Sequence, residues 1–549
     1  SRHFGSSLRR TAGQPCPLSP SRAASRCIAA MAASRLLALL PLQVLAAAGG
    51  LTPGVLPARY GSMGGDATTR SALLGATASA SSAWPQPRFA TQRQDHFDGS
   101  NAKTWKQAYY VNDTFWKAGS SAPVFLCVGG EGPPMDGSAV VDSVHCNVAV
   151  EWLRETGALM FALEHRYYGC HNSEACPVAN LSEPGALRFQ SSRQALGDVA
   201  GFVEYATQEF ALSSANRWVT FGGSYPGMLA GWARLKFPHL IHASVSSSAP
   251  VRVELEMRGY NDVVAQAYAV AHERVGGSPS CRQAIAEGHR KIGDLFSSEQ
   301  GRGRLATLFG KAAAWYAEKG NQVGFAGQGV AQFPAQSNDP TCDEAMCNIA
   351  KICVEMTNVS IGDEVQRLAE VRCIQAEAAA ARRLASPVHA AKTPTPGYGN
   401  GDQLWAWQTC TEFGFYQTCS QGSQCFYTQG LATLAEEMSF CGSMFNIPSD
   451  VVTSNIAYSN AYYGADHPQG SRVLYVNGEV DPWHANSINA PLAPELPALY
   501  VAGASHHAWT HPSVKSDQDS VVAVRAKIRA IVGKWLAEPA DEATATLRI

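Results

Sequence analysis

The sequence predicts an α/β fold in which a mostly parallel sheet is interrupted by a large helical insertion. Short apolar runs alternate with helix-like segments from about residue 104 to residue 251, and the alternation resumes near residue 472. Between these parts, residues 252–455 are rich in Ala, Gln and Glu and have a mostly helical pattern. The 549 residues and the hydrophobic content of 46% suit one large domain with an insertion, or two domains.

The segments outside this folded part have signatures of their own. Residues 31–50 combine one Arg, an apolar stretch and small residues, which is typical of a secretory signal peptide. We therefore expect Met31 to be the true start and residues 1–30 to be an upstream, non-native segment, with an organelle presequence as the alternative. Residues 51–88 predict a disordered linker, because Gly, Ala and Ser dominate most of them. Residues 541–549 are expected to form a short tail.

The predicted core has two parts, residues 89–251 and residues 456–540, on either side of the insertion. Its strands are expected at 104–111, 123–128, 158–164, 218–221, 243–248, 472–476 and 498–501. Its helices are expected at 191–210, 228–236 and 521–536. Parallel strands need long crossover connections, usually helices, so this alternation favours a mostly parallel sheet. The insertion between the two parts is interpreted as a helical cap over that sheet.

The strand predicted at 218–221 ends in Gly222-Gly223-Ser224-Tyr225-Pro226-Gly227, and a helix-like segment follows. Strand, sharp turn, serine and helix form the geometry of a nucleophile elbow, in which glycines allow the tight turn. The helix N-terminus below the serine favours developing negative charge. Pro226 departs from the strict G-x-S-x-G pattern that most lipases and esterases keep. A glycine-rich turn in an ordinary α/β protein is the alternative interpretation.

A serine nucleophile needs a general base, and the base needs a carboxylate that orients it. Asp481 and His506 each follow a predicted strand, and with Ser224 they give the order Ser, Asp, His that is typical of α/β-hydrolases. Pro482 fixes the chain after Asp481 and favours this residue as the acid. Three neighbours are alternatives: Glu479 for the acid, and His484 or His507 for the base.

Other positions have both a functional and a structural interpretation. The loop 129–133, Gly-Gly-Glu-Gly-Pro, follows a predicted strand, and its N–H groups could face an oxyanion, although a plain glycine turn fits equally well. Arg166 follows another strand, and we expect it to be a structural ion-pair partner of Glu164 or Asp198. Five aromatic residues of the insertion could line a substrate pocket but are expected mostly in the core: Trp405, Trp407, Phe413, Phe415 and Tyr416.

Composition excludes some functions and favours a compartment. The net charge of −2 and the lack of a long basic run exclude nucleic-acid binding through a charged surface. Fifteen cysteines, many in clusters and without zinc-site spacing, favour disulfides in an oxidising compartment. Thirteen of them follow residue 30, so at least one free thiol is expected. Beyond the signal segment, no apolar run is long enough to span a membrane. Sequons at Asn112, Asn180 and Asn358 permit glycosylation.

Seven short motifs occur in order between about residue 90 and residue 540. They are QRQDHF at 92–97, GGEG at 129–132, EHRYYG at 164–169, QALGD at 194–198, GGSYPG at 222–227, NGEVDPW at 477–483 and SHH at 505–507. In this combination the chain resembles the serine carboxypeptidase S28 family, and within it the thymus-specific branch. Many members carry Leu-Asp-Leu after the histidine pair, where this chain has Ala508-Trp509-Thr510, so the contacts behind the base are expected to differ.

This resemblance implies an α/β-hydrolase core with a helical cap, and cleavage of peptides after proline or a similarly small residue near a chain end. It implies His506, the first histidine of the pair, as the base. It also implies the N–H groups of Tyr225 and of Gly130 as oxyanion donors. Homodimers occur in the family and are therefore among the expected partners.

The sequence thus predicts a serine-type exopeptidase in which Ser224 attacks, His506 transfers the proton and Asp481 orients His506. Its partners are expected to be peptide substrates, and neither a metal nor an organic cofactor is needed for this chemistry. The expected location is the secretory pathway, with a secreted or a lysosomal or vacuolar protein as the end point. Carboxypeptidase and dipeptidyl peptidase activity both remain open. The alternatives are a lipase or esterase on the same fold and a non-catalytic binding protein.

Overall fold

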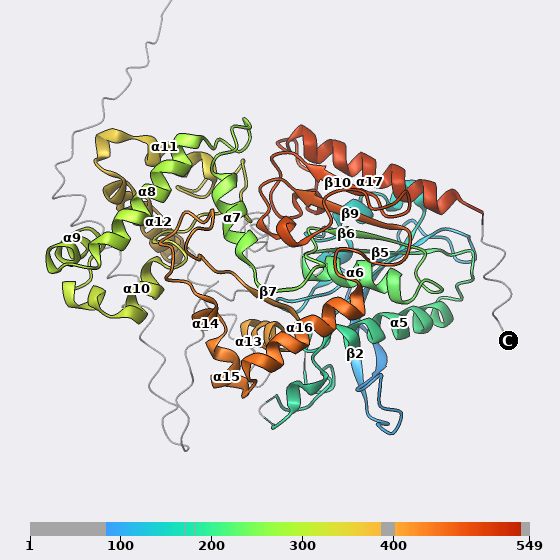
Figure 1. Ribbon diagram of the computed structural model, residues 1–549. Helices are drawn as coiled ribbons and strands as arrows, with labels where there is room; N and C mark the ends of the chain where they lie inside the picture. The colour runs from blue at the N-terminus through green and yellow to red at the C-terminus, as the bar shows by residue number, and fades with distance from the viewer. Residues whose placement is uncertain (1–83, 171, 182, 386–400, 540–549) are drawn as a thin grey trace, which may run out of the picture.

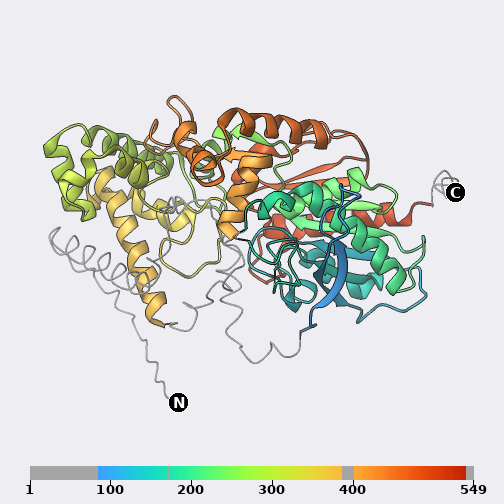
Figure 2. The ribbon, with the colours of Figure 1, turned by 90° about the horizontal axis from the view of Figure 1, so that it is seen from below.

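The structure, a computed structural model, describes residues 84–170, 172–181, 183–385 and 401–539. The expected upstream segment, signal peptide and tail, and most of the expected linker, lie outside the described residues. In Figure 1 a lobe built on a β-sheet lies beside a lobe made of helices, and Figure 2 shows the same two lobes from below. The chain enters the helical lobe after the elbow region and returns to the sheet afterwards, as the sequence predicts.

The sheet lobe is an eight-stranded, mostly parallel sheet. Its strands, in the spatial order β1-β2-β4-β3-β5-β6-β9-β10, are β1 (Arg88–Arg93), β2 (Thr104–Asn112), β4 (Leu159–Leu163), β3 (Val124–Val128), β5 (Trp218–Gly223), β6 (Ala243–Ser247), β9 (Val473–Gly478) and β10 (Ala498–Val501). Only the β1–β2 and β2–β4 pairs are antiparallel. The predicted fold class is confirmed. The edge strand β1 was not predicted, because its alternating exposed and buried residues give no apolar run.

Helices cover both faces of this sheet. Val124, Leu126 and Val128 of β3 share a buried cluster with α5 (Ser192–Glu209) and α6 (Tyr225–Lys236). The alternate β3 residues, Phe125 and Cys127, share another cluster with α17 (Asp519–Ala537). Successive side chains of a strand point to opposite faces, so α5 and α6 cover one face and α17 the other. Short segments complete the lobe: η1 (Gly137–Val140), α3 (Asn147–Val150), α4 (Leu153–Thr156), η2 (Ala186–Phe189), η7 (Pro482–Asn486) and η8 (Ala508–Thr510).

The insertion is helical, as predicted, and has a hydrophobic cluster of its own. Its helices are α7 (Arg258–Ala267), α8 (Pro279–Leu295), α9 (Glu299–Phe309), η3 (Ala313–Ala317), α10 (Lys319–Ala326), α11 (Ile349–Thr357), η4 (Val359–Ile361), α12 (Glu364–Ala385), α13 (Gly401–Gln408), α14 (Leu434–Glu437), α15 (Ser439–Phe445) and α16 (Ser449–Tyr463). A turn of π-helix over Thr409–Phe413 and a two-stranded parallel sheet, β7 (Glu254–Glu256) with β8 (Gly414–Tyr416), lie next to the core. The predicted boundary at residues 455 and 456 falls inside α16, and the division into domains stays a prediction.

Disulfides hold both lobes. The described residues contain Cys127–Cys146, Cys170–Cys176, Cys281–Cys353, Cys342–Cys347, Cys410–Cys441 and Cys419–Cys425. Cys373 is disulfide-bonded as well, so the expectation of a free thiol is wrong for the described cysteines. The expectation of a free thiol counted only the thirteen cysteines after residue 30, and an odd number of cysteines implies a free thiol only if no further cysteine can pair with them. Within the ranges that the structure describes, no helix is both long and apolar enough to cross a membrane.

Two structural expectations are confirmed. The buried Arg166 donates from Nε and Nη2 to the carboxylate of Asp198, at 2.7 Å in both cases. Burial alone would raise the pKa of Asp198, but Arg166 and His96 outweigh it and hold this pKa below its usual value. Of the five aromatic residues expected mostly in the core, four are buried in the large cluster, Trp405, Phe413, Phe415 and Tyr416, and Trp407 is half-buried.

Candidate active site

Ser224 occupies a sharp turn between β5 and α6. Its φ of 67° and ψ of −134° are outside the usual regions for a side-chain-bearing residue. The turn requires its glycines: a Cβ on Gly222 would lie 2.3 Å from the Pro226 carbonyl oxygen, and one on Gly227 would lie 2.6 Å from that of Ser247. The Ser224 N–H donates to this Ser247 oxygen at 2.9 Å. The glycine pattern around Ser224 therefore reflects close backbone packing.

Pro226 joins the elbow to the glycine loop at 129–132. A Cβ on Gly130 would lie only 2.2 Å from Pro226 Cγ, so the loop passes directly over the first turn of α6. Proline is tolerated there because the first N–H groups of a helix have no partner within the helix. For the same reason the N–H of Tyr225, the first residue of α6, points out of the helix end. The two expected oxyanion donors, Tyr225 and Gly130, thus come from adjacent segments.

Asp481 and His506 lie on separate loops and meet in the buried interior. Asp481 Oδ1 is 2.9 Å from His506 Nδ1. The same oxygen accepts the N–H of Trp483 at 3.0 Å, which caps the short helix η7 and fixes the carboxylate. Asp481 is fully buried and His506 is 6% exposed. The parallel strands β9 and β10 end at the same edge of the sheet, which brings the two loops together.

The three alternative residues have other partners. Glu479 Oε2 accepts the N–H of Gly503 at 2.7 Å. His484 Nδ1 lies 3.0 Å from the carbonyl oxygen of Gly478. His507 Nδ1 lies 3.1 Å from a hydroxyl, that of Thr510. The geometry therefore pairs Asp481 with His506 and directs each alternative elsewhere.

His507 is packed behind the elbow. A Cβ on Gly223 would lie 2.9 Å from His507 Cγ, and the His507 N–H donates to Ser248 Oγ at 2.8 Å. Burial, with His506 and His145 nearby, holds the pKa of His507 well below its usual value, so this imidazole is neutral. Its neighbour Thr510, in the segment where many family members carry Leu-Asp-Leu, also donates to the Val144 carbonyl at 2.9 Å.

Four buried polar atoms of this arrangement have no hydrogen-bond partner among the described residues. They are Ser224 Oγ, His506 Nε2, Asp481 Oδ2 and His507 Nε2. Catalytic hydrogen bonds in unliganded enzymes are often long and tighten only when substrate binds. A buried hydroxyl and imidazole without partners are costly unless they serve a function, so this site is where chemistry is expected.

A buried polar network beside the elbow was not predicted from the sequence. Tyr225 OH accepts from Gln408 Nε2 at 3.0 Å and lies 2.9 Å from His165 Nε2. Gln408 also donates to Glu412, which accepts from Ser192 N and Oγ at 2.9 and 2.6 Å. Burial raises the pKa of Glu412. Gln408 and Glu412 lie in the insertion, and no local pattern distinguishes them from other polar helical residues.

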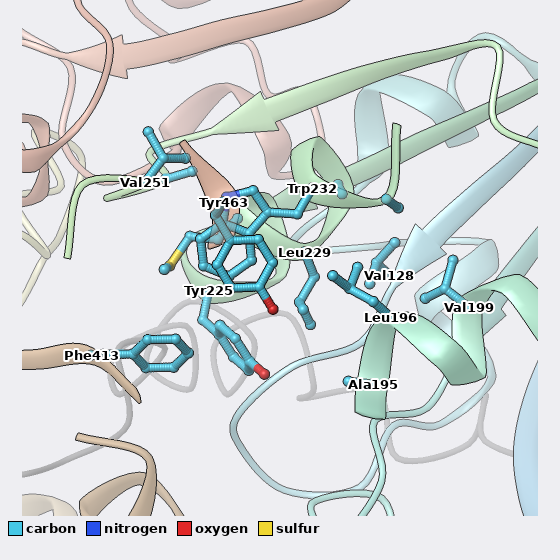
Figure 3. Packing of buried hydrophobic residues seen from close by; sticks show 14 of the residues in the cluster. Val128, Ala195, Leu196, Val199, Tyr225, Leu229, Trp232, Val251, Phe413 and Tyr463 are labelled. Carbon is cyan, nitrogen blue, oxygen red and sulfur yellow. The ribbon is translucent and has the colours of Figure 1, made fainter. Parts of the chain in front are cut away.

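Figure 3 shows how the elbow and the insertion pack together. Phe413 of the insertion lies beside the Tyr225 ring, with ring centroids 5.4 Å apart. Tyr463 of α16 stacks on Trp232 of α6 at 3.6 Å. Such aromatic contacts contribute about 0.5–1.5 kcal/mol each beyond the area they bury. Helix α6, which follows Ser224, is therefore packed against the sheet on one side and against the insertion on another.

Comparison with known proteins decides the family. The model of the serine carboxypeptidase S28 family matches residues 92–528, across both lobes. The chain belongs to this family. It is 34% identical over 477 residues to the thymus-specific serine protease of Homo sapiens, covering 83% of this chain and 87% of that protein. It is 25% identical over 489 residues to the lysosomal Pro-X carboxypeptidase of Bos taurus, covering 82% and 88%.

These values confirm the predicted family, and they confirm the prediction that the chain is more similar to the thymus-specific branch than to the Pro-X carboxypeptidase. A putative serine protease of Caenorhabditis elegans is also similar, with 32% identity over 474 residues, 81% of this chain and 83% of that protein. As a member of this family the protein is a serine peptidase, and its core is an eight-stranded, mostly parallel sheet. Its disulfides and its similarity to a lysosomal enzyme fit a protein of the secretory pathway. Among the described residues, no group of His, Cys, Asp or Glu is arranged to hold a metal ion.

Proposed function

We propose that this S28 peptidase is an exopeptidase that cleaves peptides after proline, or a similarly small residue, near a chain terminus. Ser224 is the nucleophile, His506 the base and Asp481 the residue that orients the base. The observation that carries the proposal is the 2.9 Å contact between Asp481 Oδ1 and His506 Nδ1 on the loops next to a strained serine elbow. The name of the Bos taurus relative supports proline as the preferred residue.

The proposed reaction has two halves. Ser224 Oγ attacks the scissile carbonyl carbon while His506 Nε2 takes the hydroxyl proton, and Asp481 stabilises the imidazolium that forms. The oxyanion accepts hydrogen bonds from the N–H groups of Tyr225 and Gly130, and the amine leaves with the proton from His506. Water then attacks the acyl-serine and gives a proton to His506 Nε2, and His506 returns this proton to Ser224 Oγ as the ester bond breaks and the acid product leaves. The proposed reaction requires only these residues and water, and neither a metal nor an organic cofactor takes part in it.

Two substrates test the proposal and separate the exopeptidase types. One has a free N-terminus and a reporter amine after Xaa-Pro, and the other has a blocked N-terminus and a free carboxylate after Pro-Xaa. The protein is expected to cleave one of them, and Ser224→Ala is expected to abolish this activity with unchanged folding. The preferred substrate assigns dipeptidyl peptidase or carboxypeptidase activity. No cleavage of either substrate from pH 4 to pH 8 would refute the proposal.

The same preparation tests the two alternatives. An esterase on this fold would hydrolyse short-chain esters with an efficiency equal to or above that for the proline peptides. A non-catalytic binding protein would fail to react with a fluorophosphonate at Ser224. The buried, unpartnered pair of Ser224 Oγ and His506 Nε2 favours catalysis over decay. Gel filtration of this preparation also tests the homodimer, which stays a prediction.

We propose that the mature protein is located in the lysosome, the vacuole or the extracellular space. Of its sequons, we expect the one at Asn358 to accept a glycan. Asn358 is exposed, and its Oδ1 accepts the Ser360 hydroxyl of its own sequon at 2.6 Å. It also lies between two valines that are 66% and 78% exposed, Val354 and Val359. In contrast, Asn112 uses its Nδ2 to donate to a carbonyl oxygen at 2.8 Å.

Secretory expression followed by glycosidase treatment and mass spectrometry tests this placement. Asn358→Gln is expected to remove one glycan mass, and Asn112→Gln is expected to remove none. An unglycosylated Asn358 in material that has passed through the secretory pathway would contradict the expectation. For the sequon at Asn180, residue 182 lies outside the described residues.

A further inference from the structure

One residue of the helical insertion contacts both loops that carry the proposed acid and base. The carbonyl oxygen of Gln336 accepts the backbone N–H of His506 at 3.1 Å. Its side-chain Oε1 accepts Trp483 Nε1 at 3.0 Å and Tyr260 OH at 2.8 Å. Trp483 is the residue whose N–H donates to Asp481. Gln336 therefore holds the base loop through its main chain and the acid loop through its side chain.

The Asp481–His506 pair depends on two loops beyond the ends of the paired strands. Two backbone hydrogen bonds join these loops at their start, from the Glu479 N–H to the Val501 oxygen at 3.0 Å and from the Val480 N–H to the Ala504 oxygen at 3.1 Å. Both loops follow the last residues of β9 and β10, and their relative position sets the distance between the carboxylate and the imidazole. Val480, immediately before Asp481, is fully buried and belongs to the hydrophobic cluster of the insertion. The acid loop is therefore attached to the insertion at Val480 and at Trp483. The base loop is attached to it through Gln336.

The segment that presents Gln336 is itself anchored in the insertion at both ends. Before it, the Val330 N–H donates to Nε2 of the buried His289 on α8 at 3.2 Å. After it, Asn338 Oδ1 accepts the N–H of Ile349 at the start of α11, at 2.9 Å. A movement of the insertion would therefore move Gln336, and with it the contact to both loops.

We propose that Gln336 is a positioning residue, through which the helical insertion holds the acid and the base in their reactive geometry. The inference builds on the proposed function, because it assumes that Asp481 and His506 act on Ser224. It makes the insertion part of the catalytic apparatus. Even a substrate too small to contact the insertion should then react slowly when the side-chain hydrogen bonds of Gln336 to Trp483 and Tyr260 are removed. Misplacing catalytic groups by about 1 Å costs on the order of 10²-fold in rate.

Two substitutions at Gln336 separate positioning from packing. Gln336→Met keeps the length of the side chain but removes the acceptor for Trp483 and Tyr260. It is expected to lower kcat by about 10²-fold with little change in KM. Gln336→Glu keeps the acceptor, so most of kcat should return. Its carboxylate favours the protonated imidazole of His506, so the acid limb of the kcat/KM profile should move to higher pH.

Gln332→Met is the matched control. Gln332 lies in the same segment and is exposed, and its backbone N–H and carbonyl oxygen bond to Gln375. This variant is expected to keep kcat, KM and the pH profile of the wild type. Thermal unfolding of all variants shows whether the native fold is present. If Gln336→Met is unfolded, Gln336→Glu still tests the inference through its pH profile.

A reagent that bypasses peptide specificity separates this inference from the proposed function. The rate at which a small fluorophosphonate labels Ser224 depends on the base and its position but not on proline recognition. Slower labelling in Gln336→Met, but not in Gln332→Met, supports the inference even if no proline peptide is cleaved. Unchanged labelling and unchanged kcat in a folded Gln336→Met overturn it, and so does a loss confined to KM.

Discussion

The sheet lobe and the helical insertion are stabilised and used in different ways. In the sheet lobe, the proposed site residues follow the carboxyl ends of parallel strands, and their positions are set by backbone geometry such as the positive φ of Ser224. In the insertion, helices pack around a separate cluster, and the Cys281–Cys353 disulfide joins α8 to α11 across 72 positions of sequence. The insertion nevertheless contacts the segments that carry the proposed site residues, through Gln336 at His506 and Trp483 and through Gln408 at Tyr225.

The two lobes therefore contribute to the proposed site in different ways. The ends of the sheet strands bring the proposed acid, base and nucleophile to one edge of the sheet. The insertion determines how firmly the loops that carry them are held, through contacts far apart in sequence, such as Gln408 Nε2 with Tyr225 OH. Changes in the sheet lobe should therefore remove chemistry. Changes in the insertion should alter stability or adjust the rate.

The largest expected effect is at the acid. Asp481→Asn should lower kcat by about 10⁴-fold, because an amide favours the wrong tautomer of His506 and does not stabilise the imidazolium. Glu479→Gln is the matched control, since the amide oxygen still accepts the Gly503 N–H, and its kcat should stay within about twofold of the wild type. Steady-state kinetics on the preferred substrate measure both. Equal losses in the two variants would contradict the assignment of the acid.

The next effect concerns the stability of the two lobes. Replacing Cys281 and Cys353 by alanine should lower the free energy of unfolding of the insertion by about 4 kcal/mol, as expected for a loop of 72 residues. Replacing Cys170 and Cys176, only 6 positions apart, should cost about 2 kcal/mol. Hydrogen exchange resolved by mass spectrometry assigns each loss to a lobe. A loss in the sheet lobe as large as that in the insertion would refute the separation.

The smallest effect is the acid sensitivity of the insertion. Burial lowers the pKa of His289 to about 4, and its Nε2 must be unprotonated to accept the Val330 N–H. Between pH 6.5 and about 4, the unfolded chain binds a proton that the folded chain excludes. The stability contributed by His289 therefore falls as the pH falls through this range.

His289→Gln removes this titration while keeping an acceptor and a donor. The melting temperature of this variant should fall less than that of the wild type between pH 6.5 and 4, as measured by calorimetry. His467→Gln is the control, because the His467 side chain is 84% exposed. An identical pH dependence in wild type and His289→Gln would show that His289 does not contribute to the acid sensitivity of the insertion.

Much of the sheet was predictable because its strands are buried on both faces. Such strands give short, mostly apolar runs in β3, β4 and β5, and these strands were found within one or two residues of their bounds. The serine-rich β6 was found with similar accuracy. The edge strand β1 and the three-residue strands β7 and β8 give no such run. Among the proposed site residues, Ser224 was predicted from its glycines and from the strand before it, a purely local pattern.

Three features were determined by the sequence alone: the order of Ser224, Asp481 and His506, the family, and the alternation that specifies a parallel sheet. Each of these is recognised from short motifs and runs of neighbouring residues and from their order along the chain. It favoured Asp481 over Glu479 through Pro482 and left the choice of His506 over His507 to the family resemblance, and it gave no sign of Gln336 or Glu412. The contacts of these last two residues join segments more than 100 positions apart, such as Gln336 with Trp483 and Glu412 with Ser192. Only the tertiary structure decides them, because hydrogen-bond geometry depends on distances in space, which residue order does not encode.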